Sequence, residues 1–292
     1  MTAASIPSIA ITADCLPQAW EKAVIAVYDD GIDIKTQYDK PGEAPSKDAT
    51  VMVTINDPFT EPRIHKNFPG GPEELESYRQ EVVGGIHDHW IDPVAGKWTY
   101  TYHERLFAYC PVEDLRDPDS ARPLAVVNQI QYIIDALSET SHTRRAQAIT
   151  WMPTADPQTA DPPCLQRIWC RLIADAGDGF VLNMNTHWRS RDLYRAWYMN
   201  VYALTDLQRI IAEEIAKKIG KSVKVGRYVD ITDSLHIYGS SLENAGKEVE
   251  KMKAAPFTER AWETRHPAFE MMTEEAKSKL AADPDCYAKP NG

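Results

Sequence analysis

Between residues 165 and 239, two strand-like runs, a long helix and a third strand-like run follow one another closely. The first two runs, "LQRIWCRLIA" and "GFVLNMNTHWRS", are separated by "DAGDG", a glycine-containing turn that predicts a hairpin. In "YALTDLQRIIAEEIAKKIGKS" apolar residues recur at helical spacing, and Gly220 lies where a C-terminal cap is expected. "VKVGRYVDITDSLHIYG" then returns to strand. We therefore expect a sheet with helices packed on it.

The remaining elements fit the same architecture. Periodicity and proline positions predict helices at 18–30, near 73–84 and at 128–139, and strands at 49–57 and 144–153. This order predicts an α+β fold with a large mixed sheet covered by helices. We expect a single domain over 1–292, with its core at about 15–245 and a peripheral, charged C-terminal extension at 246–292.

The charge balance narrows the classes of partner. The chain is 43% hydrophobic and 26% charged, as in ordinary soluble domains, and its net charge is −11. Nucleic acids and anionic membranes require excess positive charge, so neither is an expected partner. No apolar run approaches ~18 residues and no basic leader opens the sequence, so we expect a cytoplasmic protein.

The five cysteines are an odd number and are widely spread, without a Cys-x-x-Cys pair or a histidine at zinc-finger spacing. We expect free thiols and no metal. Buried, inert cysteine is common, and this interpretation suits Cys170. Cys164 differs because it follows two prolines and precedes a strand.

Two arginine clusters lie on either side of Cys164 in the sequence, "HTRRAQ" upstream and "WRSRD" downstream. Such clusters often mark solvated faces or ion pairs. Here their forked donors and the hydroxyl of Ser190 could instead bind a phosphate, and their charge would lower the pKa of the thiol. A thiolate beside a phosphate site suggests covalent catalysis on a phosphorylated small molecule.

A second pair of polar residues lies near the end of the last predicted strand. In "DSLHIYG", His236 and Tyr238 are two residues apart and so share one face. They could be a half-buried histidine and its neighbour, or a pair of groups that binds a sugar hydroxyl.

Taken together, these residues resemble the thymidylate synthase family, which includes the pyrimidine nucleotide hydroxymethylases. The resemblance rests on five blocks in the family's order and spacing: "TRRAQAITW", "PPC", "RSRD", "YRAWYMN" and "DSLHIY". It covers roughly residues 81 to 240. It implies a homodimer whose sheets pack together, a pyrimidine nucleoside monophosphate as substrate and 5,10-methylenetetrahydrofolate as co-substrate.

The resemblance also implies a role for each matching residue. Cys164 matches the nucleophile that adds to C6 of the pyrimidine. Arg189 and Ser190 match phosphate ligands of the same subunit. Arg144 and Arg145 match the pair that reaches the phosphate of the partner subunit.

Four further residues match groups that hold the substrates. His236 and Tyr238 match contacts to the ribose 3′-hydroxyl, and Asp192 matches the contact to the pterin of the folate. Asn200 matches the amide that binds the edge of the base. Because an amide can accept from N3–H and donate to O4, Asn200 favours uracil over cytosine.

Two matches lie where the family pattern is looser. Glu81, in "RQEVVGG", matches the glutamate that organises proton transfer around the base, and Tyr102, in "YTYHERL", matches a tyrosine near the thiol. For the phosphate ligand of the N-terminal region the candidates are Lys35, Lys40 and Lys47.

Four departures from the family pattern bear on the product. Leu165 replaces the usual histidine after the nucleophile, and residues 196–200 replace the usual Gly-x-Pro-Phe-Asn. His87 aligns with an indole that stacks on folate, and the chain ends in "AKPNG" in place of a short apolar tail. Weaker stacking and a different lid would admit water to the methylene intermediate.

Three functions therefore stay open. The first is conversion of dUMP to dTMP. The second is 5-hydroxymethylation of dUMP, dCMP or a ribonucleotide through the same intermediate, with water in place of hydride. The third is a non-catalytic nucleotide-binding homologue, which would not need the thiol.

Overall fold

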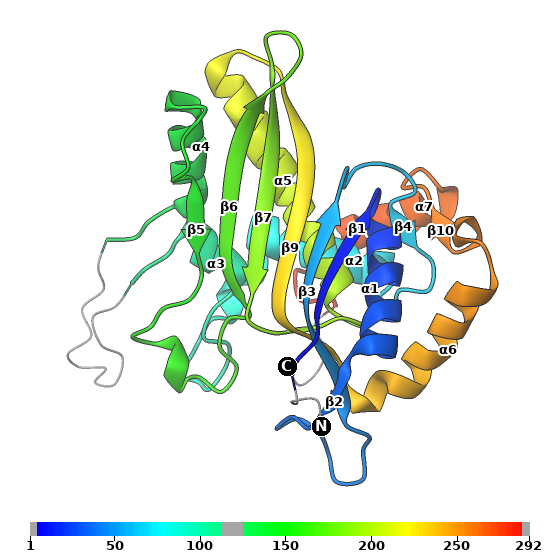
Figure 1. Ribbon diagram of the computed structural model, residues 1–292. Helices are drawn as coiled ribbons and strands as arrows, with labels where there is room; N and C mark the ends of the chain where they lie inside the picture. Colours follow the sequence, from blue (N-terminus) through cyan, green and yellow to red (C-terminus); the bar gives the residue numbers. More distant parts are fainter. Residues whose placement is uncertain (1–4, 112–124, 288–292) are drawn as a thin grey trace.

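One mixed sheet of eight strands runs through the computed structural model, which describes residues 5–111 and 125–287 (Figure 1). Six strands lie side by side in the order β1 (Ser8–Ala13), β3 (Ser46–Ile55), β9 (Val223–Ile237), β7 (Phe180–Trp188), β6 (Leu165–Ala174) and β5 (Gln147–Ile149). Beside them, β2 (Ile32–Ile34) pairs with β3 and β8 (Arg191–Asp192) pairs with β9. The β1–β3 and β7–β9 pairs are parallel and the β3–β9, β6–β7 and β5–β6 pairs antiparallel. The predicted α+β fold with a mixed sheet is confirmed.

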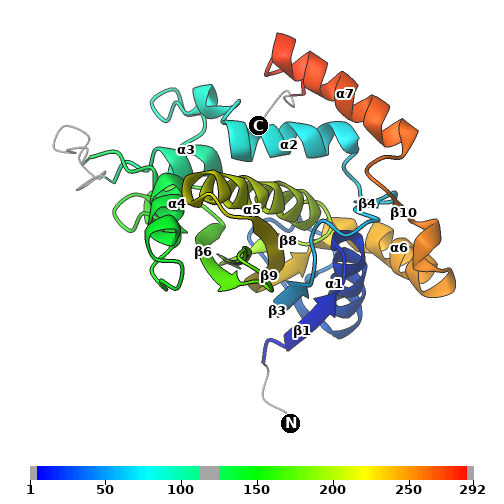
Figure 2. The same cartoon turned by 90° about the horizontal axis from the view of Figure 1, so that it is seen from above.

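Helices form two layers over the sheet (Figure 2). The inner layer comprises α1 (Leu16–Asp30), α4 (Gln129–Glu139) and α5 (Trp197–Ile219). Farther out, α2 (Pro72–Gly84) packs on α5, α7 (Pro267–Ala282) packs on α2, and α6 (Leu242–Ala254) packs on α1. The shorter elements are α3 (Tyr102–Phe107), the β4 (Ile64–His65) and β10 (Ala261–Trp262) pair, and the 3-10 turns η1 (Asp88–Trp90), η2 (Asp156–Gln158), η3 (Gly239–Ser241) and η4 (Phe257–Glu259).

The predicted hairpin forms between β6 and β7. Gly177 in its turn has a φ of +104°, a conformation that side chains other than glycine's rarely adopt. The register pairs Leu165 with Trp188, so the start of β6 and the end of β7 lie side by side at one end of the strands. Cys164 and Arg189 lie there, directly outside the two strands.

The long helix begins earlier than its amphipathic pattern predicted. The pattern is clear from Tyr202, whereas α5 starts at Trp197. The first two turns are buried on several sides because α5 lies between the sheet and α2, so no single apolar stripe marks them. Its end is as predicted, with Gly220 in the left-handed conformation at a φ of +67°.

The strand predicted at 144–153 is largely wrong. The strand itself is confined to Gln147–Ile149, with one further backbone hydrogen bond to β6 at Ala146 and one at Thr150, and β5 pairs with β6 alone because it is the edge of the sheet. Arg144 and Arg145 precede it and are exposed.

The sheet face away from the helices keeps several apolar side chains in solvent. Met52 is 45% exposed and Ile173 is 49% exposed. No helix in the part of the chain that the structure describes is long and apolar enough to cross a membrane.

The residues after 246 pack on the rest of the chain through α6 and α7. Arg260 donates from Nε to Glu21 Oε1 of α1 at 2.7 Å, and His65 Nε2 lies 2.8 Å from the same oxygen. After α7 in the chain, the segment 283–287 contacts η1, where Asp285 Oδ1 accepts a hydrogen bond from Trp90 Nε1 at 2.7 Å. The tail "AKPNG", residues 288–292, lies outside the described residues.

Candidate active site

Cys164 lies just before β6 and is held there by contacts on both sides. The hydroxyl of Tyr102 accepts hydrogen bonds from the backbone N–H groups of Cys164 and Leu165, each at 3.2 Å. On the other side, the backbone N–H of Arg189 donates to the carbonyl of Cys164 at 2.9 Å. Tyr102 is the first residue of α3, whose N-terminus is capped by the side chain of Thr101. The nucleophile predicted from the sequence is therefore fixed by a strand neighbour and a helix end.

The side chain of Arg189 also binds the segment that precedes Cys164. Its guanidinium donates from Nε to the carbonyl of Pro163 at 3.1 Å and from Nη2 to that of Pro162 at 2.6 Å. Arg189 thus places a cation beside the thiol, with Ser190 next in the chain.

The predicted lowering of the pKa of the Cys164 thiol is wrong as a net effect. Burial is the largest influence and raises this pKa. Arg189 and Arg191 act in the predicted direction, and Asp161 acts against them. The sequence showed the arginines but not the burial that outweighs them. By comparison, burial alone raises the pKa of Cys170 in the core to about 12.

Three polar residues form a row across neighbouring strands next to this site. His236 of β9 pairs in register with Asp192 of β8 on one side and with Asp48 of β3 on the other. Directly paired residues share a face of a sheet, so the imidazole lies between two carboxyl groups. Burial raises the pKa of both Asp48 and Asp192.

Two atoms of this row have no hydrogen-bond partner among the described residues, namely Nε2 of His236 and Oδ1 of Asp48. The Nδ1 of His236 is occupied by the carbonyl of Ser234 at 3.2 Å. Tyr238 packs on His236 with ring centroids 4.5 Å apart, and burial raises the pKa of its phenol to about 12. Buried polar atoms without partners suit a ligand hydroxyl. The sequence did not indicate Asp48, because only the strand register brings it here.

Asn200, the predicted base-binding amide, points to α2. Its Nδ2 donates to the hydroxyl of Tyr78 at 2.7 Å. Tyr78 precedes Glu81 by one helical turn and so shares its face of α2. Burial raises the pKa of the Tyr78 phenol well above its ordinary value, and the nearby Tyr102 and Glu81 raise it further. Tyr78 was missed by the sequence analysis, although its spacing from Glu81 could have indicated it.

His87 is 3% exposed and both of its ring nitrogens are engaged. Nδ1 lies 2.7 Å from Glu81 Oε2, and Nε2 lies 3.0 Å from the carbonyl oxygen of Pro284. The ring stacks on Trp90 with centroids 3.7 Å apart and planes 7° apart. Trp90 therefore covers one of the faces with which His87 was predicted to stack on folate.

The loop with the candidate phosphate ligands of the N-terminal region lies beside Tyr238. Tyr38, in the loop between Lys35 and Lys47, packs against Tyr238 with ring centroids 6.2 Å apart. The ammonium of Lys47 pairs with Asp33 at 2.9 Å, which makes Lys47 the least available of the three lysines.

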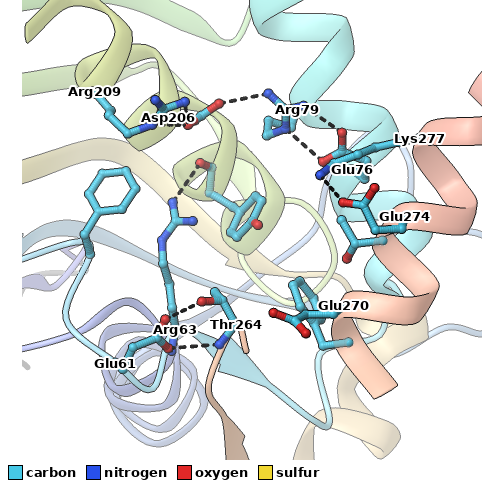
Figure 3. Close-up of a pocket in the computed structure, with 14 residues that line it drawn as sticks. Glu61, Arg63, Glu76, Arg79, Asp206, Arg209, Thr264, Glu270, Glu274 and Lys277 are labelled. Atoms are coloured by element: carbon cyan, nitrogen blue, oxygen red, sulfur yellow. Dashed lines mark hydrogen bonds and ion pairs between the residues drawn. The ribbon is translucent and has the colours of Figure 1, made fainter. Parts of the chain in front are cut away.

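A cavity of about 510 Å³ lies apart from these residues, between α2, α5, α7 and the loop before β4 (Figure 3). Its charged side chains bind one another. Arg79 pairs with Glu76 at 2.6 Å and with Asp206 at 2.9 Å, and Lys277 pairs with Glu274 at 2.6 Å. We interpret this cavity as part of the packing interface between α7 and the helices α2 and α5.

Within residues 5–111 and 125–287, no three His, Cys, Asp or Glu side chains gather in a way that could hold a metal ion.

Comparisons with known proteins agree with the geometry. The family model described as "Thymidylate synthase" matches residues 81–276. A protein of Methanococcoides burtonii named "Putative thymidylate synthase" is 28% identical over 228 residues, which cover 78% of this chain and 88% of the relative. A protein of the same name from Methanosarcina acetivorans is 28% identical over 230 residues, with the same coverage. A third, from Methanothermobacter marburgensis, is 26% identical over 255 residues, or 82% of this chain and 97% of the relative.

Proposed function

Since this chain belongs to the thymidylate synthase family of folate-dependent transferases, we propose that it converts dUMP to dTMP through a covalent bond between Cys164 and C6 of the base. The main support is the position of Cys164. Its backbone is fixed by Tyr102 and Arg189 at the end of β6. The paired residues Asp192 and His236 lie at the neighbouring strand ends.

The reaction starts when the thiol loses its proton and Sγ attacks C6. The electrons of the C5–C6 double bond move toward O4, where the amide of Asn200 can donate a hydrogen bond. The folate supplies a methylene group, which bonds to C5, and later a hydride. Glu81 is the proton-transfer group for loss of the C5 proton, which accompanies breakage of the bond between the methylene carbon and the folate. The hydride is then transferred to this carbon as Sγ leaves C6, which restores the C5–C6 double bond and releases the methylated base and dihydrofolate.

Four residues are proposed to bind the rest of the nucleotide. Arg189 and Ser190 bind the phosphate, which would bring a dianion to the cation already beside Cys164. His236 and Tyr238 bind the sugar through the free Nε2 and the phenol. Asp192 is proposed to bind the pterin.

A second copy of the chain is proposed to complete the site. The exposed Met52 and Ile173 give the open face of the sheet an apolar character that a dimer would bury. Arg144 and Arg145 lie exposed at the edge of this sheet, from which they could reach a partner's phosphate.

Mixing inactive Arg145→Ala and Cys164→Ser proteins tests this, because an exchanged dimer holds one intact site. No recovery of activity would argue against a shared site.

A 5-hydroxymethylase is the second candidate, and Leu165 favours it. This residue stands where the family usually has histidine, and it is fully buried against the strand that carries Trp188. Leucine cannot hydrogen-bond to the substrate or to water as a histidine could. Access of water to the methylene intermediate would therefore differ from that in relatives with histidine.

Product analysis distinguishes these reactions. The protein is incubated with methylenetetrahydrofolate and each of dUMP, dCMP, UMP and CMP; the base is identified by mass, and dihydrofolate by absorbance. A methylated base with dihydrofolate supports the synthase, and a hydroxymethylated base without it supports the hydroxymethylase. Cys164→Ser should be inactive and Cys170→Ala active. No product from any nucleotide would contradict both enzymes.

A further inference from the structure

The hydrogen bonds of His87 determine how many protons it shares with Glu81. A carbonyl oxygen only accepts, so the contact with Pro284 at 3.0 Å requires a hydrogen on Nε2. The contact of Nδ1 with Glu81 at 2.7 Å requires one hydrogen between the two atoms. The pair is therefore an imidazolium with a carboxylate, or a neutral imidazole with a carboxylic acid. Both forms contain one proton beyond the Nε2–H.

Losing that proton would be unfavourable. It would leave the lone pair of Nδ1 facing a carboxylate oxygen in a site where His87 is 3% and Glu81 9% exposed. Water could not separate the two groups easily at such burial.

The nearby charge of Asp285 acts in the same direction. Asp285 approaches from the segment after α7, where its carboxylate also binds Trp90 and His89. On η1 itself, Asp88 is engaged by Thr101 and by His103 of α3. Burial opposes the charge on His87, but the bonds to Glu81 and Pro284 outweigh it and raise the pKa of the imidazole.

We infer that His87 is a positioning residue that keeps a proton at Glu81, and that the carbonyl of Pro284 holds His87 in the tautomer this requires. The inference rests on the proposed function, in which Glu81 transfers protons to and from the base. It gives the C-terminal segment a chemical connection to the site. Without the Pro284 carbonyl, Nε2 would lose its acceptor and the proton would no longer be confined to the side facing Glu81.

Nuclear magnetic resonance of imidazole-¹⁵N-labelled protein tests the proton count without any turnover. The His87→Phe spectrum identifies the signals of His87. We expect a hydrogen on Nε2 throughout the titration, with only Nδ1 changing its state. A neutral ring with hydrogen on Nδ1 and a bare Nε2 would overturn the inference.

The pH dependence of kcat/KM tests the effect on catalysis. His87→Phe keeps a ring to stack on Trp90 but cannot hold a proton. We expect the alkaline limb of its profile to move down by about one pH unit or more, because the proton shared across the 2.7 Å contact then loses its imidazole partner. His89→Phe is the matched control: this histidine is on the same turn, is exposed and binds the same segment through Asp285, and its profile should match the wild type. Coincident limbs for the two variants would refute the positioning role.

Truncation tests the connection to the C-terminal segment. A chain ending at Asp283 loses the Pro284 carbonyl and should show the same downward shift of the limb, whereas one ending at Tyr287 should not. An unshifted limb in the shorter chain would refute the role of Pro284. If no variant and no wild type turns over any nucleotide, the proposed function fails, while the labelled spectra still decide the proton count.

Discussion

Replacing Tyr102 with phenylalanine should remove the hydrogen bonds that hold the backbone of Cys164 from one side. The change keeps the ring, whose edge packs on Trp188 at a centroid distance of 5.7 Å. It removes the acceptor of two backbone N–H groups, those of Cys164 and Leu165, each bound at 3.2 Å. A buried donor left without an acceptor costs about 1–3 kcal/mol. Because both bonds are long and Cys164 is partly exposed, we expect a loss of roughly 2–3 kcal/mol in the free energy of unfolding for the pair.

The same change should slow the reaction of the thiol. With the loop before β6 released on one side, Sγ is held only through the contacts of Arg189, and a displacement near 1 Å reduces the rate by about 100-fold. Urea unfolding measures the first effect, and the rate of covalent adduct formation with a 5-fluorinated pyrimidine nucleotide measures the second.

Tyr100→Phe is the matched control for both measurements. Its ring lies 5.7 Å from that of Tyr102, and burial likewise raises the pKa of its phenol. The hydroxyl of Tyr100 binds that of Tyr102, so its removal takes one partner from the Tyr102 phenol but leaves the acceptor of the Cys164 and Leu165 N–H groups in place. If the two variants form adduct equally fast, Tyr102 does not hold Cys164.

Four further outcomes are expected. Cys164→Ser should form no adduct yet bind nucleotide nearly as the wild type does in calorimetry, because its hydroxyl needs a strong base to attack; a near-normal rate would exclude the covalent route. Arg189→Ala should weaken nucleotide binding by roughly 1.5–3 kcal/mol, and unchanged calorimetric affinity would remove Arg189 from the phosphate site. Asp230→Asn should lower the free energy of unfolding by roughly 3–5 kcal/mol, since Arg191 stays buried beside it without a counterion; a loss below ~1 kcal/mol would show that the pair is not needed. Because the folded pKa of His87 is raised, its stabilising effect is complete below about pH 6.5 and is lost as the pH rises through the folded pKa, so urea unfolding should show that decline in the wild type and not in His87→Phe.

The residues on the sheet were the predictable half of the site. Cys164, Arg189 and His236 lie in strands and turns whose patterns are local, and their order along the chain is that of the family. Register then brings them together, since Leu165 pairs with Trp188 and Asp192 with His236. The predicted hairpin therefore brings Cys164 and Arg189 together, whereas the pairing of Asp192 with His236 was not predicted from the strand patterns.

The residues on the helices were less predictable because their contacts are long-range. His87 and Pro284 are 197 positions apart, and Tyr78 and Asn200 are 122 apart. No periodicity within a segment encodes such pairs. The net pKa of Cys164 was mispredicted for a related reason, since charges can be counted in a sequence but burial depends on the whole fold.

The candidate site takes some residues from the sheet and others from the helices outside it, and this division bears on how its reaction could change in evolution. In the proposed reaction, bond formation to the base depends on the sheet, through Cys164 and Arg189, and a register slip there would turn every side chain to the opposite face. Proton transfer in the same proposal depends on α2, η1 and the segment around Pro284, none of which is part of a strand. A descendant of this chain could therefore acquire a new product by altering its outer helices while inheriting its nucleophile intact, and directed evolution toward a different 5-substituent should begin in that outer layer.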